Sequence, residues 1–167
     1  PTPPLESLRT MISLAATDLV GATPHDRRPH SETRTQISFI DVSHPYFCAS
    51  TDPDKLSYVE LPDEDDDHRK GMVGLLLKHM YGTRAAAMGW HSEYSGTLID
   101  SGFVPGTASA CVFYHPVRNL TCSVHGDDLT TTGTKRDLDW FKQQLEAKHE
   151  ITEAQRLGPG PNDHKEA

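Results

Sequence analysis

Leu120–Gly133 reads LTCSVHGDDLTTTG: two short runs of β-type composition on either side of a four-residue turn, His125-Gly126-Asp127-Asp128. A Gly-Asp step between two such runs is ordinary hairpin chemistry and predicts a hairpin. Two adjacent carboxylates lie at the tip of this hairpin, where their mutual repulsion has to be offset. Hard divalent cations such as Mg2+ prefer carboxylate oxygens, so the pair is a candidate set of metal ligands, with a solvated turn as the alternative.

A third carboxylate lies at the end of another strand-like segment. Asp41 directly follows Gln36–Ile40, a run of β-type composition. On spacing alone, Asp41 is equally well explained as a strand-end turn residue or as a helix N-cap. If the two segments are neighbouring strands, however, the three carboxylates meet, and together they can hold divalent ions.

The remaining sequence predicts alternating helices and strands. We expect helices over 5–16, 85–99 and 135–149, and strands over 36–41, 56–61, 111–115, 120–124 and 129–132. The side chains expected to face inward are Leu5, Leu8, Ile12 and Ala15 in the first helix, Met88, Trp90, Tyr94 and Leu98 in the second, and Leu138, Phe141 and Leu145 in the third. Gly102 is expected to end the second helix. This order predicts an α+β fold, a split β-α-β antiparallel sheet backed by helices on one face.

The length of 167 residues is that of one domain with a sizeable core. No run is long enough to span a membrane and no charged-then-apolar leader opens the chain, so we expect no membrane association. The three cysteines lack C-x-x-C spacing, which argues against a zinc site or a disulfide framework. Their odd number suits a reducing intracellular setting. We expect a polar loop over 18–35 and a disordered tail over 158–167. The opening Pro1-Thr2-Pro3-Pro4 suggests a piece of a longer polyprotein.

Several short motifs occur in the order of one known family. Asp41–Phe47 (DVSHPYF) resembles its first catalytic motif, Asp-Val followed by an aromatic pair, and Tyr81–Trp90 (YGTRAAAMGW) resembles its second, Tyr-Gly with a Trp at the same spacing. Val124–Asp128 (VHGDD) stands where the family carries aromatic-x-Asp-Asp. Three further segments follow the family's order: Ser101–Phe103, Cys111–His115 and Leu157–Gly158. The family is the reverse transcriptase of Ty1/copia-type retrotransposons, and the resemblance covers most of the chain.

The resemblance implies a polymerase palm, with a ferredoxin-like sheet and part of the fingers. It also implies an RNA-directed DNA polymerase that transfers deoxynucleotides to a primer 3′-hydroxyl with two Mg2+ ions, or Mn2+ in their place. The catalytic residues are then Asp41, Asp127 and Asp128. Asp41 and Asp127 bridge the metals, the backbone carbonyl of Val42 adds an oxygen ligand, and Asp128 supports or orients the site.

The resemblance also assigns the nucleotide contacts. Tyr46 lies where reverse transcriptases carry a bulky ring beneath the incoming sugar, which excludes a 2′-hydroxyl by close packing. We expect Phe47, its neighbour, to face the core. Tyr81 and Gly82 are expected to lie against the incoming nucleotide and the template base, Gly82 because the backbone can approach closely where no Cβ is present. The alternative for this pair is an aromatic core residue followed by a loop glycine.

His125 and Gly126, beside the metals, are assigned to primer contact, with packing as the alternative for His125. The chain departs from the family here, because the position of His125 is usually aromatic. Ala86-Ala87 replaces a small-Pro pair, and residues 18–35 are an insertion. Pro45 stands where a small, helix-compatible residue is usual, so we expect an altered turn after Asp41.

The charge of the chain is unusual for a nucleic-acid-binding protein. The sequence holds 16 Lys and Arg against 24 Asp and Glu, a net charge of −8, whereas such proteins usually present a basic face. Residues 63–67 contribute five of the negative charges in one solvated run. Basic fingers and thumb segments would have to supply the grip, so we expect this fragment alone to be poorly active or inactive.

The partners implied by the resemblance are a primed RNA or DNA template, deoxynucleoside triphosphates, and the remaining Pol segments: fingers, thumb, RNase H and integrase. The implied compartments are a cytoplasmic particle and the nucleus. Two other functions stay open. The chain is alternatively an inactive relic or domesticated module that keeps nucleic-acid or protein contacts, or an acidic interaction domain whose Asp-Asp turn is fortuitous.

Overall fold

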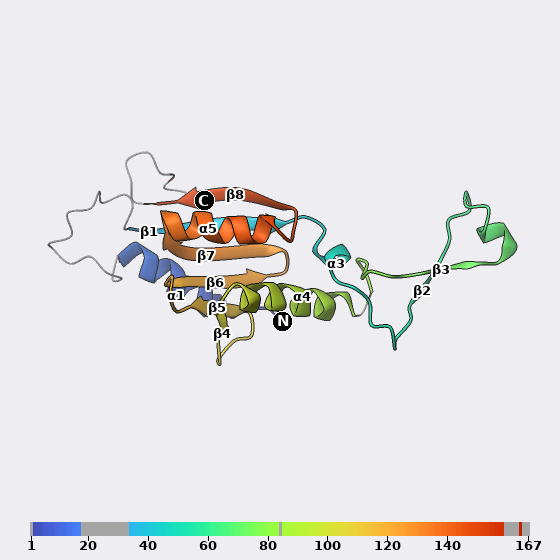
Figure 1. The fold of residues 1–167 in the computed structure, drawn as a ribbon, viewed down its shortest axis with the longest axis horizontal. Coiled ribbons are helices and arrows are strands. Elements are labelled where there is room, and N and C mark those ends of the chain that lie inside the picture. The colour runs from blue at the N-terminus through green and yellow to red at the C-terminus, as the bar shows by residue number, and fades with distance from the viewer. Residues whose placement is uncertain (1, 18–33, 84, 159–163, 165–167) are drawn as a thin grey trace. The chain divides into compact units, whose positions relative to one another are not determined.

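The computed structural model describes residues 2–17, 34–83, 85–158 and 164 (Figure 1). The chain divides into two compact units, one made of Pro1–Ser43 and Ser95–Ala167 and the other of His44–Tyr94. The first unit is a mixed α+β structure that contains the main sheet. Most of the predicted 18–35 loop and of the predicted 158–167 tail lies outside the described residues.

The first unit is built on a six-stranded sheet in the order β4-β5-β6-β7-β1-β8. Every neighbouring pair is antiparallel. The strands are β1 Thr35–Val42, β4 Val104–Pro105, β5 Val112–His115, β6 Leu120–His125, β7 Asp128–Thr134 and β8 Ile151–Leu157. The predicted antiparallel sheet is confirmed, as are the strands expected at β1, β5, β6 and β7. The edge strands β4 and β8 were not predicted.

Strand β1 lies inside the sheet, paired with β7 on one side and β8 on the other. Helix α5 (Lys135–Glu146) connects β7 to β8, so the two strands that it joins flank β1. This connection is the split β-α-β arrangement expected from the sequence. Thr134 begins the helix as its N-cap, where its hydroxyl accepts a hydrogen bond from the backbone N–H of Asp137. The predicted inward residues of α5 are all buried: Leu138, Phe141 and Leu145.

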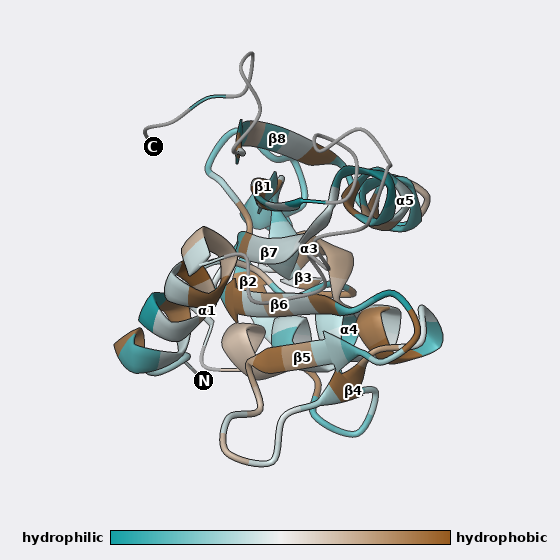
Figure 2. Cartoon of the chain, turned by 90° about the vertical axis from the view of Figure 1, so that its left-hand side faces the viewer, coloured by the Kyte–Doolittle hydropathy of each residue, from teal (hydrophilic) through white to brown (hydrophobic). Residues whose placement is uncertain are grey.

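Helices cover both faces of the sheet, so the prediction of helices on one face is wrong. Figure 2 shows α1 (Leu5–Thr17) and α5 on opposite sides of the strands. Helix α1 buries Met11, whereas two of the predicted inward residues, Leu5 and Ile12, are exposed. Apolar residues surround more than one side of α1, so their periodicity alone does not select the buried side.

Helix α4 (Ala86–Asp100) confirms three of its four predicted inward positions. The buried residues are Trp90, Tyr94 and Leu98. The fourth, Met88, is 75% exposed, so its assignment to the core is wrong. Gly102 follows the helix with φ +93°, and its N–H donates to the carbonyl oxygen of Ile99 at 2.9 Å. A left-handed residue at this position is a common helix ending, and glycine adopts it without steric cost.

The second unit contains a two-stranded β-hairpin and two short helical segments. These are α3 Pro45–Cys48, β2 Tyr58–Glu60, η1 His68–Lys70 and β3 Val73–Leu75. Pro45 begins α3 in its first turn, where its missing N–H costs nothing, and His44 before it has φ 51°. The predicted strand 56–61 is confirmed as the shorter β2, and part of the apolar segment after Gly71 forms β3.

Two residues of the predicted tail, Gly158 and His164, are among the described residues. Leu157 closes β8 and forms an isolated bridge with His164. The N–H of Gly158 donates to the carbonyl oxygen of His164 at 3.2 Å. The disorder expected over 158–167 stays a prediction.

Candidate metal centre

The Asp-Asp turn closes the hairpin between β6 and β7. Gly126 and Asp127 are its two central residues, and Asp128 is the first residue of β7. Gly126 has φ +66°, whereas Asp127 is not among the residues with positive φ. Positive φ at the first central residue only is the pattern of a type II′ turn, which suits the twist of a hairpin and favours glycine at that position. The turn places Asp127 at the tip and Asp128 at the start of the strand.

The neighbouring strand β1 brings Asp41 to the same place. The strand register pairs Asp41 directly with Asp128, so their side chains lie on the same face of the sheet. The N–H of Val42 donates to the backbone carbonyl oxygen of Asp127 at 3.0 Å. This bond fixes the hairpin tip to β1. Strand β1 continues through Val42, so Asp41 lies within the strand and not at its end.

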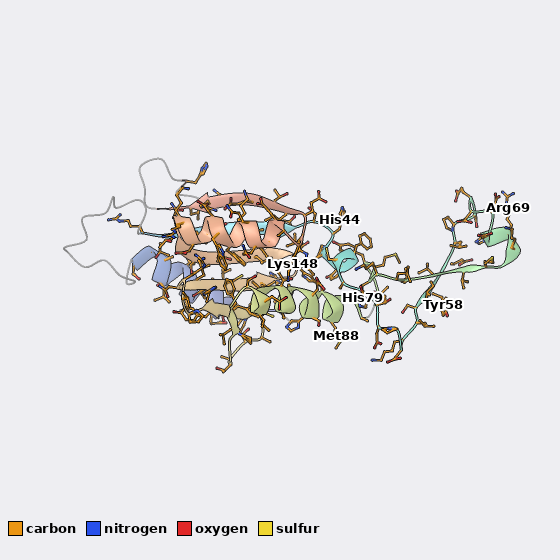
Figure 3. All side chains as sticks on the ribbon, viewed as in Figure 1. His44, Tyr58, Arg69, His79, Met88 and Lys148 are labelled. Carbon is orange, nitrogen blue, oxygen red and sulfur yellow. The ribbon has the colours of Figure 1, made fainter. Side chains whose placement is uncertain are left out.

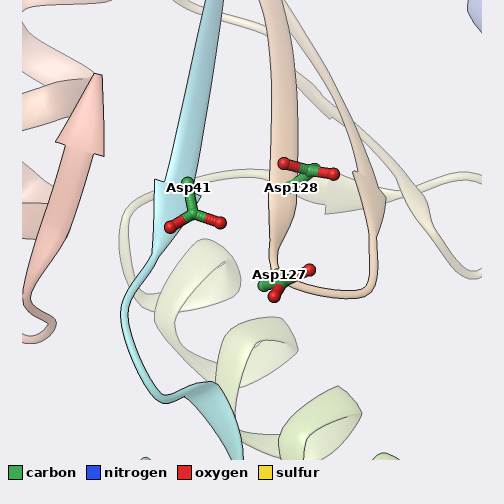
Figure 4. Close-up of side chains that lie close together, drawn as sticks. All are labelled: Asp41, Asp127 and Asp128. Carbon is green, nitrogen blue, oxygen red and sulfur yellow. The ribbon is translucent and has the colours of Figure 1, made fainter. Parts of the chain in front are cut away.

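The three carboxylates converge as predicted. One oxygen from each of Asp41, Asp127 and Asp128 can be chosen so that all three lie within 4.8 Å of one another. Figure 4 shows the side chains on β1 and on the β6–β7 hairpin. Oxygen ligands bind Mg2+ or Ca2+ at about 2.0–2.6 Å, so oxygens on opposite sides of one ion are roughly 4–5 Å apart. The spacing and the chemistry of the donors therefore fit a hard divalent cation.

The pKa of Asp128 reports the repulsion within this cluster. Partial burial raises this pKa above its ordinary value of 3.8, and the neighbouring charges of Asp127 and Asp41 raise it further, while His125 acts in the opposite direction. Without a cation, the ionised form of Asp128 is therefore disfavoured by its surroundings. A bound cation would reverse that balance, because it favours the ionised ligands.

The other residues predicted near the metals adopt well-defined positions. The side chain of Val42 is buried, so only its backbone faces the hairpin tip, through the bond to Asp127. His125 lies opposite Asp128 in the hairpin register and is exposed. Packing in the core is thus excluded for His125, and primer contact stays a prediction. Gly126 has open space where a Cβ would be, so only its positive φ requires glycine.

The residues predicted to contact the nucleotide belong to the second unit. The rings of Tyr46 and Tyr81 lie edge to face, with centroids 4.6 Å apart. Phe47 also contacts Tyr81 edge to face, with a centroid distance of 5.8 Å, and is 47% exposed, so the expectation that it faces the core is wrong. Gly82 has φ +84° and no atom within 4 Å of an added Cβ. The structure thus groups Tyr46, Phe47 and Tyr81, and nucleotide contact by Tyr46, Tyr81 and Gly82 stays a prediction.

Strand β8 supports β1 through charged and polar groups that the sequence analysis missed. The carboxylate of Glu153 accepts hydrogen bonds from Ser38 Oγ on β1 at 2.6 Å and from Arg156 Nε at 2.8 Å. Arg156 also forms an ion pair with Asp139 on α5. Burial by itself would raise the pKa of Glu153, but the hydrogen bonds from Ser38 and Arg156 outweigh it, and the pKa lies below its ordinary 4.5. The sequence of such a strand has little hydrophobic periodicity, because the side chains that it directs toward its neighbours are polar.

No known family model matches the chain, and no curated protein is similar to it in sequence. Among the helices that the structure describes, none combines the length and the apolar character that a membrane crossing requires. The functional interpretation therefore rests on the motifs and on the geometry of the carboxylate cluster.

Proposed function

We propose that this chain is the palm, with part of the fingers, of a retrotransposon-type reverse transcriptase. In this proposal it takes part in the template-directed transfer of deoxynucleotides to a primer 3′-hydroxyl. The observation that carries the proposal is the convergence of Asp41, Asp127 and Asp128 within 4.8 Å. Two of the three lie at a hairpin tip and the third on the adjacent strand.

The topology around the cluster supports the proposal. The strands that carry the carboxylates are inner strands of an antiparallel sheet, flanked by β6 and β8. The order β6-β7-β1-β8, with α5 joining β7 to β8, is that of a ferredoxin-like sheet, the core expected of a polymerase palm. A shared architecture alone does not carry function, so the weight lies on the carboxylates.

The residues have defined roles in this proposal. Asp41, Asp127 and Asp128 would hold the divalent ions, with Asp41 and Asp127 as the main ligands and Asp128 as a supporting one, and the carbonyl of Val42 would offer a further oxygen. Such ions, when bound, would supply charge stabilisation for the attacking and leaving oxygens of an in-line displacement. The protein contributes ligands held in advance, because the backbone of the turn is bonded to β1 through Val42 and Asp127.

Metal binding by the chain itself is the first test. We expect Mn2+ to bind wild type and Mg2+ to compete for the same site, as measured by electron paramagnetic resonance of free Mn2+. Asp127→Asn is expected to weaken Mn2+ binding at least tenfold, because it removes a shared charged ligand. Glu146→Gln, at an exposed glutamate on α5, is the matched control and should leave affinity unchanged. Equal affinity in wild type and Asp127→Asn would contradict a metal centre here.

Primer extension is the second test, and it separates the polymerase from an inactive relic. The chain is assayed together with the remaining Pol segments on a primed RNA template with deoxynucleotides and Mg2+. The proposal expects extension by wild type and by Glu146→Gln, and its loss in Asp127→Asn. Metal binding without any extension would favour the relic. Extension that survives Asp127→Asn would exclude this cluster as the catalytic centre.

A further inference from the structure

The hairpin of the second unit has one bare, mostly apolar face. Strand register places Tyr58 opposite Leu75 and Glu60 opposite Val73, so these four side chains share a face. Pairing continues by one hydrogen bond, from the N–H of Leu76 to the carbonyl oxygen of Ser57 at 2.9 Å. The two-residue alternation then adds Leu56 and Leu77 to that side. The hairpin face is thus Leu56, Tyr58, Glu60, Val73, Leu75 and Leu77, all of them exposed.

The side chains on the opposite side of the same hairpin are less exposed. Val59, Leu61, Gly74 and Leu76 are each only partly exposed. Side-chain atoms of Leu61 and Val59 lie 3.2 and 3.3 Å from where a Cβ on Gly74 would be, so this side is tightly packed. The asymmetry matters because a two-stranded hairpin on its own is marginally stable in water and needs a packed surface. The opposite side is packed in part by the hairpin's own side chains, and the hairpin face is exposed.

The charge of the hairpin restricts what can cover this face. The segment between Leu56 and Leu77 holds six acidic residues against two basic ones, and five of the acidic residues form the 63–67 run in the connection between the strands. Figure 3 shows Tyr58 on the hairpin and Arg69 in that connection. Nucleic-acid phosphates would be repelled by such a run. A second copy of this chain, with a net charge of −8, would be repelled as well.

We propose that the hairpin face is a docking site for a basic, extended polypeptide segment of a protein partner. Apolar side chains at every second position of such a segment match the two-residue spacing of the hairpin face. Lysine or arginine side chains beyond them complement the 63–67 run. The proposal is independent of the carboxylate cluster, because the two share no residue, and each can fail without the other.

A labelled peptide of alternating leucine and lysine is a direct probe. Fluorescence anisotropy measures its binding to the full chain. Tyr58→Ser and Leu77→Ser, two exposed positions on the hairpin face, are each expected to weaken binding about tenfold. Met88→Ser is the matched control, because Met88 is equally apolar and exposed but lies on α4 in the same unit (Figure 3). Circular dichroism checks that each variant is folded.

The charge requirement is tested separately. Asp63→Asn, Asp65→Asn and Asp66→Asn together should weaken binding about tenfold and flatten its dependence on NaCl, because exposed charge pairs are screened by salt. A peptide of alternating leucine and glutamate should not bind. Unchanged affinity in both hairpin-face variants would show that the peptide senses charge alone, and this would overturn the proposal.

Two further outcomes would also overturn it. Concentration-dependent dimerisation of wild type in sedimentation velocity, abolished by Leu77→Ser, would assign the hairpin face to a second copy of the chain. Binding of a labelled RNA duplex that is lost in Tyr58→Ser would assign it to nucleic acid. Monomeric wild type, with RNA binding unaffected by Tyr58→Ser, would support the assignment to a basic polypeptide.

Discussion

Asp128→Asn should stabilise the metal-free protein. Asp128 faces Asp41 across the β1–β7 pair and follows Asp127, so neutralising it removes two of the three repulsions within the cluster. After partial burial, the same two carboxylates are the next causes of the raised pKa of Asp128. Asparagine has nearly the shape of aspartate, so the strand and turn are expected to persist.

The size of this stabilisation follows from the distance between the carboxylate oxygens. Two unit charges 4.8 Å apart repel by about 0.9 kcal/mol at the dielectric constant of water. Two such terms give about 1.7 kcal/mol, and screening and side-chain relaxation at this exposed site reduce the gain to about 1–1.5 kcal/mol. For a chain of 167 residues, a gain of this size raises the melting temperature by about 2–6 °C.

Urea unfolding at pH 7 in EDTA, followed by circular dichroism, measures this gain against Glu146→Gln, which should stay within about 0.5 kcal/mol of wild type. Because folding raises the pKa of Asp128, its penalty is present at neutral pH and is relieved as the pH falls through that raised value. The difference between variant and wild type should therefore disappear below the ordinary pKa of 3.8. Mg2+ at ten times its Kd should stabilise wild type by about 1.4 kcal/mol and the variant by less. An Asp128→Asn protein no more stable than wild type in EDTA would refute this reasoning.

Three further predictions concern the support of β1, two glycines and sugar discrimination. Glu153→Gln should cost about 2 kcal/mol in urea unfolding, because its carboxylate accepts charge-assisted bonds at a partly buried site, while the control Glu146→Gln stays near zero. Gly133→Ala should lower the free energy of unfolding by about 1–3 kcal/mol, because the added Cβ would come within 2.2 Å of Leu120 Cδ2. Gly96→Ala, in open space on α4, should raise the free energy of unfolding by about 0.5–1 kcal/mol. Thermal melts compare the two variants. Tyr46→Ala, in an active polymerase that contains this chain, should raise ribonucleotide incorporation far more than it lowers deoxynucleotide use, and an unchanged ratio in primer extension would place sugar discrimination elsewhere.

The sequence predicts the elements that have a strong local signal. The buried stripe of α5 repeats at helical spacing, and the inner strands β6 and β7 have β-type composition around a Gly-Asp turn, so each has a strong local signal. The register between β1 and β7 could be anticipated only through Asp41 and the Asp-Asp turn. Their convergence depends on pairing between residues distant in the sequence, which no local pattern encodes.

The predictions that the structure contradicts share one physical cause: the polarity of a residue does not by itself decide whether it is buried. Strand β8 was missed because its side chains toward the sheet and α5 include Glu153 and Arg156, which are satisfied by ion pairs rather than by hydrophobic packing. Met88 and Phe47 were placed in the core because they are apolar, yet both are exposed. Exposure of single apolar residues is common, so residue type alone does not fix the side that a helix buries.

The hydrogen bond from the N–H of Val42 to the carbonyl oxygen of Asp127 holds the backbone of the hairpin tip independently of the charges of the acidic side chains. Both of its atoms belong to the main chain, so no side-chain substitution short of proline at position 42 removes the donor or the acceptor. The amide proton of Val42 is therefore a built-in reporter: its hydrogen exchange rate follows the opening of the hairpin tip whichever acidic side chains are neutralised. Slow exchange retained in each asparagine variant would show that any loss of metal affinity comes from lost charge in an intact turn.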